Sequence, residues 1–209
     1  TLLHISKVLE EAESLKKMGV TFTKPTIDID LVRDWKNKVV SQLSGGIGQM
    51  AKARKVNTIQ AEATFLSDNE VQLKSESSTD TITFDYCIIA SGSSSSIIPG
   101  IPFDNENVLN SKTALDLEKI PKSLLVIGGG YIGLEMGTVF SALGSSVSLA
   151  EFLPNLLPGA DPDLVKPLAR KLKKEFNEIL LSTKITKVEQ AKSGAMDVTM
   201  EKDGEEVTK

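Results

Sequence analysis

Apolar residues recur with two different periods along this chain, and the changes of period separate helical from extended segments. Residues 2–18 show helical spacing and stop at Gly19, and residues 28–55 repeat that spacing over a longer stretch. The apolar positions of these two predicted helices are Leu2, Ile5, Val8, Leu9, Ala12 and Leu15, and then Leu31, Trp35, Val39, Leu43, Ile47 and Met50. Gly45, Gly46 and Gly48 interrupt the second pattern, where each glycine costs about 1 kcal/mol relative to alanine. We expect a break there or, preferably, close packing against a neighbour.

Extended segments follow. Residues 57–73 alternate with period two around Asp68 and Asn69, which predicts a β-hairpin. Residues 81–90 alternate at first and then become continuously apolar, as in a strand that enters a sheet covered on both faces. Cys87 lies in this run and is therefore expected to be an inert core residue. Residues 109–120 predict a short connecting helix.

The last third of the chain alternates strands with helices, which is typical of an α/β fold. Strands are predicted at residues 124–127 and 146–150, with a helix between them. Asp161 and Pro162 then suit the N-cap and first position of a helix. Two strands, 179–189 and 196–200, flank a turn at Ser193, and Asp203 opens a hairpin whose return strand begins at residue 205.

The candidate chemistry lies in residues 124–151. Gly128, Gly130 and Gly133 follow the first strand at the G-x-G-x-x-G spacing of a dinucleotide-binding turn. The first glycine permits the sharp turn, the second lets a pyrophosphate approach the backbone, and the third lets the helix pack closely on the strand. The N–H groups that begin the helix can then bind the pyrophosphate without a basic side chain. Gly137 is placed to extend the close packing by one helical turn.

Glu151 ends the second strand, about 20 positions after the first glycine, where this fold places an acceptor for the adenosine ribose hydroxyls. A glycine turn alone is a weak signal, because glycine also serves purely conformational needs. Here the strand, the glycines, the helix, the second strand and the carboxylate all agree, so we favour a dinucleotide site. Phe152 follows Glu151, and no arginine is near to receive a 2′-phosphate, which favours NAD over NADP.

Composition excludes several classes of function. The 209 residues are 40% apolar, as in an ordinary globular protein, and the net charge of −4 without a dense basic block argues against nucleic-acid binding. One cysteine and one histidine, His4, cannot supply a disulfide or a multi-histidine metal site. We interpret His4 as a surface or core residue rather than a catalytic one. No apolar run is long enough for a membrane span and the start lacks a signal-peptide pattern, so we expect a cytoplasmic protein.

Three runs in order, TLLHISKVLEEAESLKKMGV, FDYCIIASGSSSSIIPGIP and SLLVIGGGYIGLEMG, resemble the dihydrolipoamide dehydrogenases, a branch of the pyridine nucleotide–disulfide oxidoreductases. The resemblance implies Rossmann-like three-layer FAD- and NAD-binding domains with β-hairpin and meander insertions. Residues 1–120 match the later part of the flavin domain and residues 121–209 match most of the NAD domain. The family's N-terminal flavin motif, redox cysteine pair and dimer domain have no counterpart here. We therefore expect an internal piece of a longer protein that is inactive alone, and we name no catalytic residue.

The resemblance also implies individual cofactor contacts. Ser91 stands where the family has a threonine and keeps its hydroxyl, while Ala63 replaces the usual glycine near the flavin adenine. Tyr131 matches the residue that gates the nicotinamide pocket, Glu135 an acid that pairs with a flavin-side lysine, and Ile185 a position beside the NAD adenine. The full sets are Ala63, Ser91, Gly92 and Ser93 for FAD, and Gly128, Gly129, Gly130, Tyr131, Ile132, Gly133, Glu135, Glu151 and Ile185 for NAD.

The activity implied is oxidation of dihydrolipoamide, carried by the lipoyl domain of a 2-oxo acid dehydrogenase complex, with electrons passing through FAD to NAD in a homodimer. Two other interpretations stay open: a non-catalytic NAD-binding redox-sensing module, and another NADH-dependent disulfide reductase such as a mercuric reductase or a transhydrogenase. A simple NAD-dependent dehydrogenase is disfavoured, because it has no need for the hairpin-rich segment 57–90.

Overall fold

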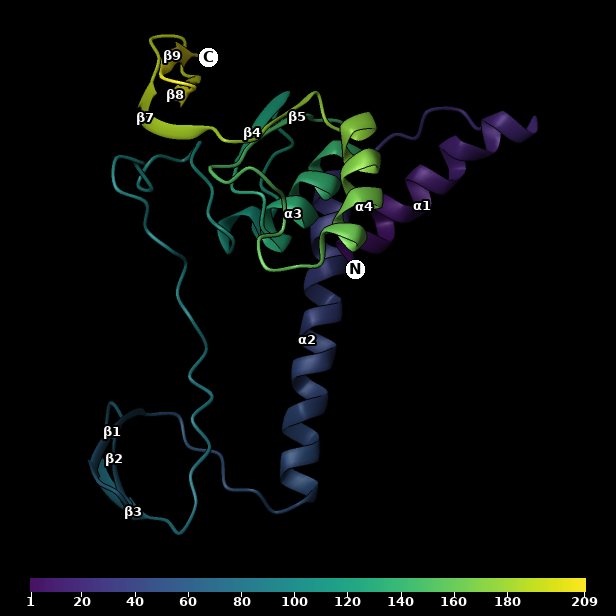
Figure 1. Cartoon of the computed structure of the whole chain (residues 1–209). Helices are drawn as coiled ribbons and strands as arrows, with labels where there is room; N and C mark the ends of the chain where they lie inside the picture. The colour runs from purple at the N-terminus through teal and green to yellow at the C-terminus, as the bar shows by residue number, and fades with distance from the viewer. The chain divides into compact units, whose positions relative to one another are not determined.

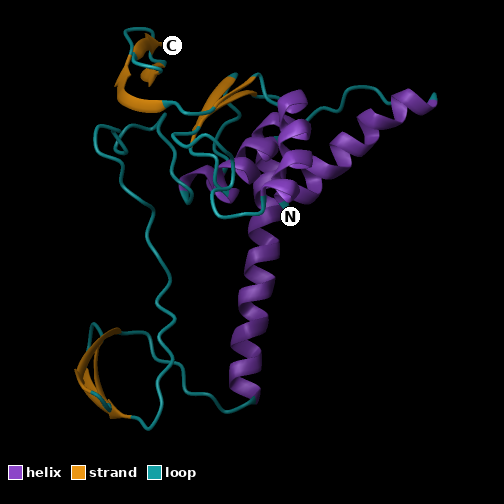
Figure 2. Ribbon diagram, in the orientation of Figure 1, coloured by secondary structure: helices purple, strands orange, loops and turns teal.

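A computed structural model describes residues 1–209, which divide into one unit of residues 1–37 and 95–209 and a second unit of residues 38–94. Figures 1 and 2 show the helices and strands. The helices are α1 (Leu2–Ser14), η1 (Leu15–Met18), α2 (Ile29–Ala53), η2 (Thr113–Asp116), α3 (Tyr131–Ala142) and α4 (Pro162–Glu175). The strands are β1 (Glu62–Ser67), β2 (Glu70–Lys74), β3 (Thr79–Thr83), β4 (Ser123–Ile127), β5 (Ser146–Ala150), β6 (Glu178–Leu180), β7 (Lys184–Gln190), β8 (Met196–Lys202) and β9 (Glu205–Thr208).

The first unit is built on a parallel sheet in the order β4-β5-β6, whose crossovers are α3 and α4. Side chains of a strand alternate between its two faces. Leu124 and Val126 of β4 accordingly pack with the helix cluster around Phe140, whereas Leu125 packs with Val198 of the β7-β8-β9 sheet. Helices, parallel sheet and antiparallel sheet thus form the three layers that the sequence predicts.

Local signals explain where the elements of this unit begin and end. The Asp161 side chain accepts a hydrogen bond from the Asp163 N–H at 2.9 Å, and Pro162 occupies the first helical position of α4. Asp203 and Gly204 both have positive φ, 54° and 83°, as the two-residue turn between β8 and β9 requires. These two predictions are confirmed.

The second unit contains the predicted hairpin. β1 pairs with β2 in antiparallel register on either side of Asp68 and Asn69, and β3 adds a third antiparallel strand. Phe65 and Phe84 pack edge to face, with ring centroids 6.0 Å apart.

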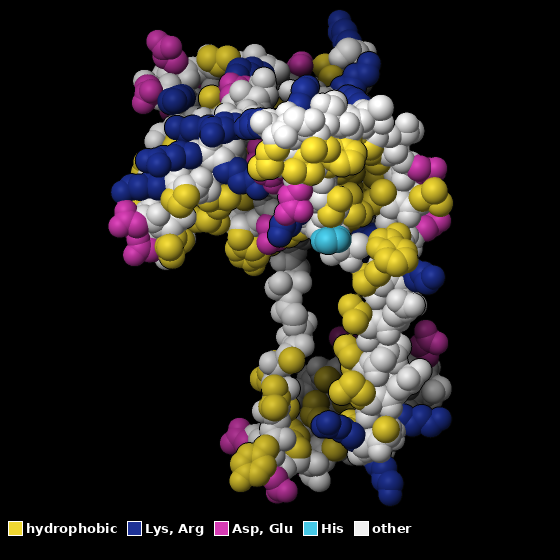
Figure 3. All heavy atoms as spheres, turned by 90° about the vertical axis from the view of Figure 1, so that its right-hand side faces the viewer, with side chains coloured by type: hydrophobic (Ala, Val, Ile, Leu, Met, Phe, Trp, Pro, Cys, Tyr) yellow, Lys and Arg dark blue, Asp and Glu magenta, His cyan; other side chains and the backbone are white.

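The glycines of α2 do not act as predicted. The helix continues from Ile29 to Ala53 without a break, and a Cβ atom at Gly45, Gly46 or Gly48 would meet nothing within 4 Å. Both predictions are therefore wrong. The helix is not broken, because its backbone hydrogen bonds need no side chains at these positions, and the space beside the three glycines is open rather than filled by a neighbour. Hydrophobic side chains follow the exposed surface of this helix (Figure 3), including Leu43 and Ile47. No helix here combines the length and the hydropathy that a membrane crossing needs.

The apolar run after β3 is a second correction. The predicted strand 81–90 ends as β3 at Thr83, and Tyr86, Ile88 and Ile89 are exposed in an irregular segment. Cys87 is exposed with a free thiol and is not the core residue expected. A continuously apolar strand is buried when it lies in a sheet whose two faces are both covered, and no strand among residues 1–209 pairs with this run to form such a sheet.

The predicted helix at residues 109–120 is reduced to η2. The Asn110 side chain accepts hydrogen bonds from the N–H groups of Lys112 and Thr113 at 2.9 and 3.0 Å, which favours a tight turn. Leu117 then ends the element with φ of 51°. The single His4 is exposed on α1 (Figure 3), in agreement with a surface role.

Candidate functional site

The glycine turn lies between β4 and α3, at the carboxyl edge of the parallel sheet. Gly128 has φ of 106°, which L side chains rarely adopt, and its N–H donates to Ala150 O at 2.8 Å. The turn is thus anchored to the end of β5, and the chain reverses from β4 into α3 within three residues. This is the sharp turn predicted for the first glycine.

Gly130 is the N-cap of α3 and is conformationally unlike Gly128. Its φ of −74° and ψ of 171° suit any residue, and no side chain caps the helix. A Cβ atom here would meet nothing within 4 Å, so the space next to this backbone is open. Uncapped N–H groups at a helix start attract anions. The site therefore fits a pyrophosphate, although no conformational need explains the glycine.

Gly133 and Gly137 lie on the packed side of α3. A Cβ on Gly133 would collide with the carbonyl oxygen of Gly128 and lie 3.0 Å from a methyl of Val126. A Cβ on Gly137 would lie 2.7 Å from the Phe176 ring. Both glycines bring the helix close to its neighbours, which agrees with the packing role inferred from their spacing.

Glu151 follows β5 directly and is buried, with 7% of its surface exposed. One carboxylate oxygen accepts from the Gly129 N–H at 2.5 Å and the other accepts from the Leu153 N–H at 2.6 Å. The structure thus brings the predicted ribose acceptor into direct contact with the glycine turn. Each carboxylate oxygen has a second lone pair, so both can still accept from a ligand hydroxyl.

Sequence reasoning missed the segment 152–157, which folds back onto Gly129. The Leu157 N–H donates to Gly129 O at 2.9 Å, and Leu156 is buried with 4% of its surface exposed. A Cβ on Gly129 would lie 2.6 Å from the Leu156 side chain, which explains why this position is also glycine. The available signal was the pair of leucines between Asn155 and Pro158, since apolar residues in a loop need a place to be buried.

Of the other residues predicted to bind NAD, Tyr131, Ile132 and Glu135 follow the turn directly, whereas Ile185 lies in another sheet. Tyr131 is 68% exposed at the first position of α3, and Ile132 and Glu135 are also exposed on its first turns. Ile185 is half-buried in β7 and packs against the small cluster of Val188, Val198 and Met200.

The four residues predicted to contact FAD belong to the second unit. Ser91, Gly92 and Ser93 are exposed in an irregular segment, and Ala63 is exposed in β1. Gly92 has φ of 75°, so glycine suits the backbone at that position. Because these residues form no shared hydrogen-bonding site within their unit, the flavin assignment rests on the sequence resemblance.

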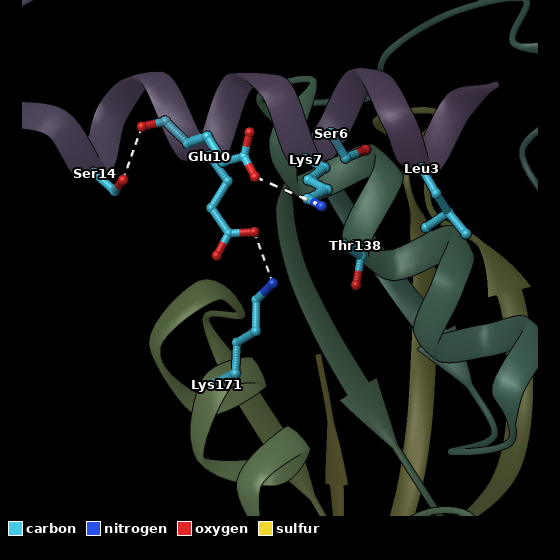
Figure 4. Close-up of a pocket in the computed structure, with 8 residues that line it drawn as sticks. Leu3, Ser6, Lys7, Glu10, Ser14, Thr138 and Lys171 are labelled. Atoms are coloured by element: carbon cyan, nitrogen blue, oxygen red, sulfur yellow. Dashed lines mark hydrogen bonds and ion pairs between the residues drawn. The ribbon is translucent and has the colours of Figure 1, made fainter.

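A separate hollow of about 370 Å³ lies between α1 and the helices α3 and α4. Figure 4 shows Glu10 of α1 reaching Lys171 of α4, and these side chains are 2.7 Å apart. Lys171 also lies 3.6 Å from Glu175. The hydrogen bond that Lys171 donates to Glu10 raises the pKa of Lys171 above 10.5. Burial raises the pKa of Glu175 above 4.5 and outweighs the attraction of Lys171. None of the predicted site residues lines this hollow.

The chain belongs to the pyridine nucleotide-disulphide oxidoreductase family, whose pattern matches residues 2–208. This confirms the resemblance predicted from the three sequence runs.

Curated relatives that the chain matches include dihydrolipoyl dehydrogenases. The chain is 44% identical over 200 residues to the dihydrolipoyl dehydrogenase of Vibrio cholerae, covering 96% of this chain and 42% of the relative. The dihydrolipoyl dehydrogenase of Haemophilus influenzae is 43% identical over 201 residues, again covering 96% of this chain and 42% of the relative. The chain therefore spans less than half the length of these relatives.

Solved structures share the fold. The Cu(II) complex of the HOCl-induced flavoprotein disulfide reductase RclA from Escherichia coli superposes with a TM-score of 0.75 at 21% identity, over 99% of this chain and 43% of the other. The Cu(II) complex of a cysteine-to-serine mutant of the same reductase gives 0.72 at 22% identity, over 98% of this chain and 44% of the other. The α/β class with its parallel and antiparallel sheets is confirmed.

Proposed function

We propose that the glycine turn and Glu151 bind NAD. The observation that carries this proposal is the open space at Gly130, beside an uncapped helix N-terminus and a buried carboxylate. The helix N–H groups would bind the pyrophosphate and Glu151 would accept hydrogen bonds from the adenosine ribose. Gly128, Gly129 and Gly133 shape the turn, and Tyr131, Ile132, Glu135 and Ile185 are proposed to surround the rest of the dinucleotide.

The same site favours NAD over NADP. Phe152 follows Glu151 and is 67% exposed, which supports an aromatic ring rather than a cation beside the proposed ribose site. No lysine or arginine occurs in the sequence from residue 152 to residue 161. A buried carboxylate beside the ribose also repels a phosphate at that position.

We further propose that the chain is part of a dihydrolipoamide dehydrogenase. Membership of the family supports this proposal, and so do the two dihydrolipoyl dehydrogenases that are more than 40% identical to the chain. NAD bound at the glycine turn would accept the electrons that arrive through FAD, and Ala63, Ser91, Gly92 and Ser93 are proposed flavin contacts. The lipoyl domain of a 2-oxo acid dehydrogenase complex as partner, a homodimeric state and a cytoplasmic location belong to the same proposal.

Two measurements test these proposals separately. Titration of the protein with NADH and with NADPH, followed by the fluorescence of the nicotinamide, tests the site: NADH is expected to bind at least about tenfold more tightly. Reduction of NAD by dihydrolipoamide in the whole protein tests the activity. Tight NADH binding without dihydrolipoamide oxidation would favour another NADH-dependent disulfide reductase or a sensing module.

A further inference from the structure

Glu151 and segment 152–157, which follows it, together hold both backbone polar groups of Gly129. The Gly129 N–H donates to Glu151, and the Gly129 carbonyl oxygen accepts from the Leu157 N–H. Glu151 in turn accepts from the Leu153 N–H, so the segment is tied to the carboxylate and to the turn at once. Leu157 has φ of 50°, which a leucine rarely adopts. The segment keeps this conformation while its neighbour Leu156 is buried against Gly129.

This arrangement determines where the next N–H group points. The C=O of Gly129 and the N–H of Gly130 belong to one planar trans peptide, so they point in opposite directions. Because the Gly129 carbonyl is held by Leu157, the Gly130 N–H is directed away from segment 152–157. Gly130 is the residue next to the open space at the start of α3. The segment therefore orients an N–H group toward the place proposed for the pyrophosphate.

We propose that Leu156 is a positioning residue for NAD binding, a role that rests on the NAD site proposed above. Its side chain is the apolar anchor that keeps segment 152–157 against the glycine turn. Through that anchor it maintains two features of the site: the direction of the Gly130 N–H and the orientation of the Glu151 carboxylate. Leu156 itself touches the turn from the buried side and makes no contact with NAD.

Leu156→Ala tests this role, with Leu143→Ala as the matched control. Both leucines are buried in the same core cluster, 4% and 6% exposed, but Leu143 lies at the far end of α3 as its C-cap. Both variants lose packing and are expected to unfold at a lower temperature. Only Leu156→Ala is expected to raise the Kd for NADH, by about tenfold or more, while Leu143→Ala stays within about twofold. Leu156→Met, which keeps the side-chain volume, is expected to restore binding.

In the whole enzyme the same change is expected to raise the KM for NAD and to leave kcat unchanged at saturating NAD. If the alanine variant does not fold, Leu156→Val replaces it in the same comparison with Leu143→Ala. Equal NADH affinity in the Leu156 and Leu143 variants would overturn the positioning role while the NAD site stands. Failure of the unmodified protein to bind NADH would instead refute the proposed site.

Discussion

Gly130→Ala separates a ligand-binding glycine from a structural one. In the free protein the added methyl group meets nothing within 4 Å, and φ of −74° is comfortable for alanine. Two small effects oppose each other: alanine is a poorer N-cap than glycine by about 0.5–1 kcal/mol, and it lowers the entropy of the unfolded chain by a comparable amount, about 0.4–1 kcal/mol. The free energy of unfolding is therefore expected to change by less than about 1 kcal/mol.

The same methyl group would occupy the space proposed for the pyrophosphate. A phosphate oxygen bound to a backbone N–H lies about 2.9 Å from the nitrogen, whereas a carbon atom keeps other heavy atoms at about 3.5–4 Å. Displacing the phosphate weakens a charge-assisted hydrogen bond worth about 1.5–3 kcal/mol. We expect the Kd for NADH to rise about tenfold to a hundredfold.

Gly133→Ala provides the contrast of a structural glycine, because it places the same methyl group three residues further along the chain, on the packed side of α3. There the group would collide with the carbonyl oxygen of Gly128 and press on Val126, so the fold must adjust. Overpacking of this kind costs about 1–3 kcal/mol of folding free energy. Thermal unfolding and NADH titration of both variants provide the test. If Gly130→Ala binds NADH as tightly as the parent, the ligand does not approach this backbone and the assignment is wrong.

Three further perturbations follow from the site and from the hollow beside α1. Glu151→Ala removes the proposed ribose acceptor, so NADH affinity is expected to fall by about 1–3 kcal/mol. Unlike Gly130→Ala it should also lower the unfolding temperature, since the N–H groups of Gly129 and Leu153 lose their acceptor. The raised pKa of Glu175 means that the native state binds this proton more tightly than the unfolded state does, so the free energy of unfolding should decline as pH rises through 4.5 and through the raised pKa. Denaturant titrations at several pH values should show that Glu175→Gln lacks this decline. The raised pKa of Lys171 predicts that stability is lost as pH rises above 10.5, and Lys171→Met should lose this dependence; an unchanged profile in that variant would contradict the assignment to Lys171.

The parts of the fold that could be predicted from the sequence depend on short-range signals. The β4 strand, the glycine turn, α3 and β5 are contiguous, and each boundary carries its own marker, as Gly128 and Glu151 show. The turn at Asp203 and Gly204 and the cap at Asp161 are equally local, since each requires only neighbouring backbone geometry. Predictions made from such signals are confirmed because tertiary contacts have little opportunity to override them.

The errors arose where the outcome depends on distant partners or on one side chain. The run around Cys87 has the composition of a buried strand, but its burial requires a sheet covered on both faces, and the run is exposed here. A short helix is predicted at residues 109–120, yet the Asn110 side chain binds the N–H groups of Lys112 and Thr113 in a tight turn and Leu117 ends the element with φ of 51°. The glycines of α2 predict a break or close packing, but the same apolar spacing is found on a packed helix face and on an open one, and here the face is open.

The candidate site combines both kinds of information in Glu151. Sequence spacing predicts a ligand acceptor at this position, but it does not predict that the same carboxylate binds Gly129 and Leu153 before any ligand arrives. A carboxylate has about four lone-pair positions, and two N–H donors occupy only half of them. The bound donors fix the carboxylate in one orientation, so less side-chain entropy is lost when a ribose binds. Glu151 is buried, with 7% of its surface exposed, and the low local dielectric constant strengthens each of its hydrogen bonds. One residue can therefore both support the turn and serve the proposed recognition of the ribose. Glu151→Ala removes both functions, whereas Gly130→Ala is expected to weaken ligand binding and to leave the two hydrogen bonds of Glu151 intact.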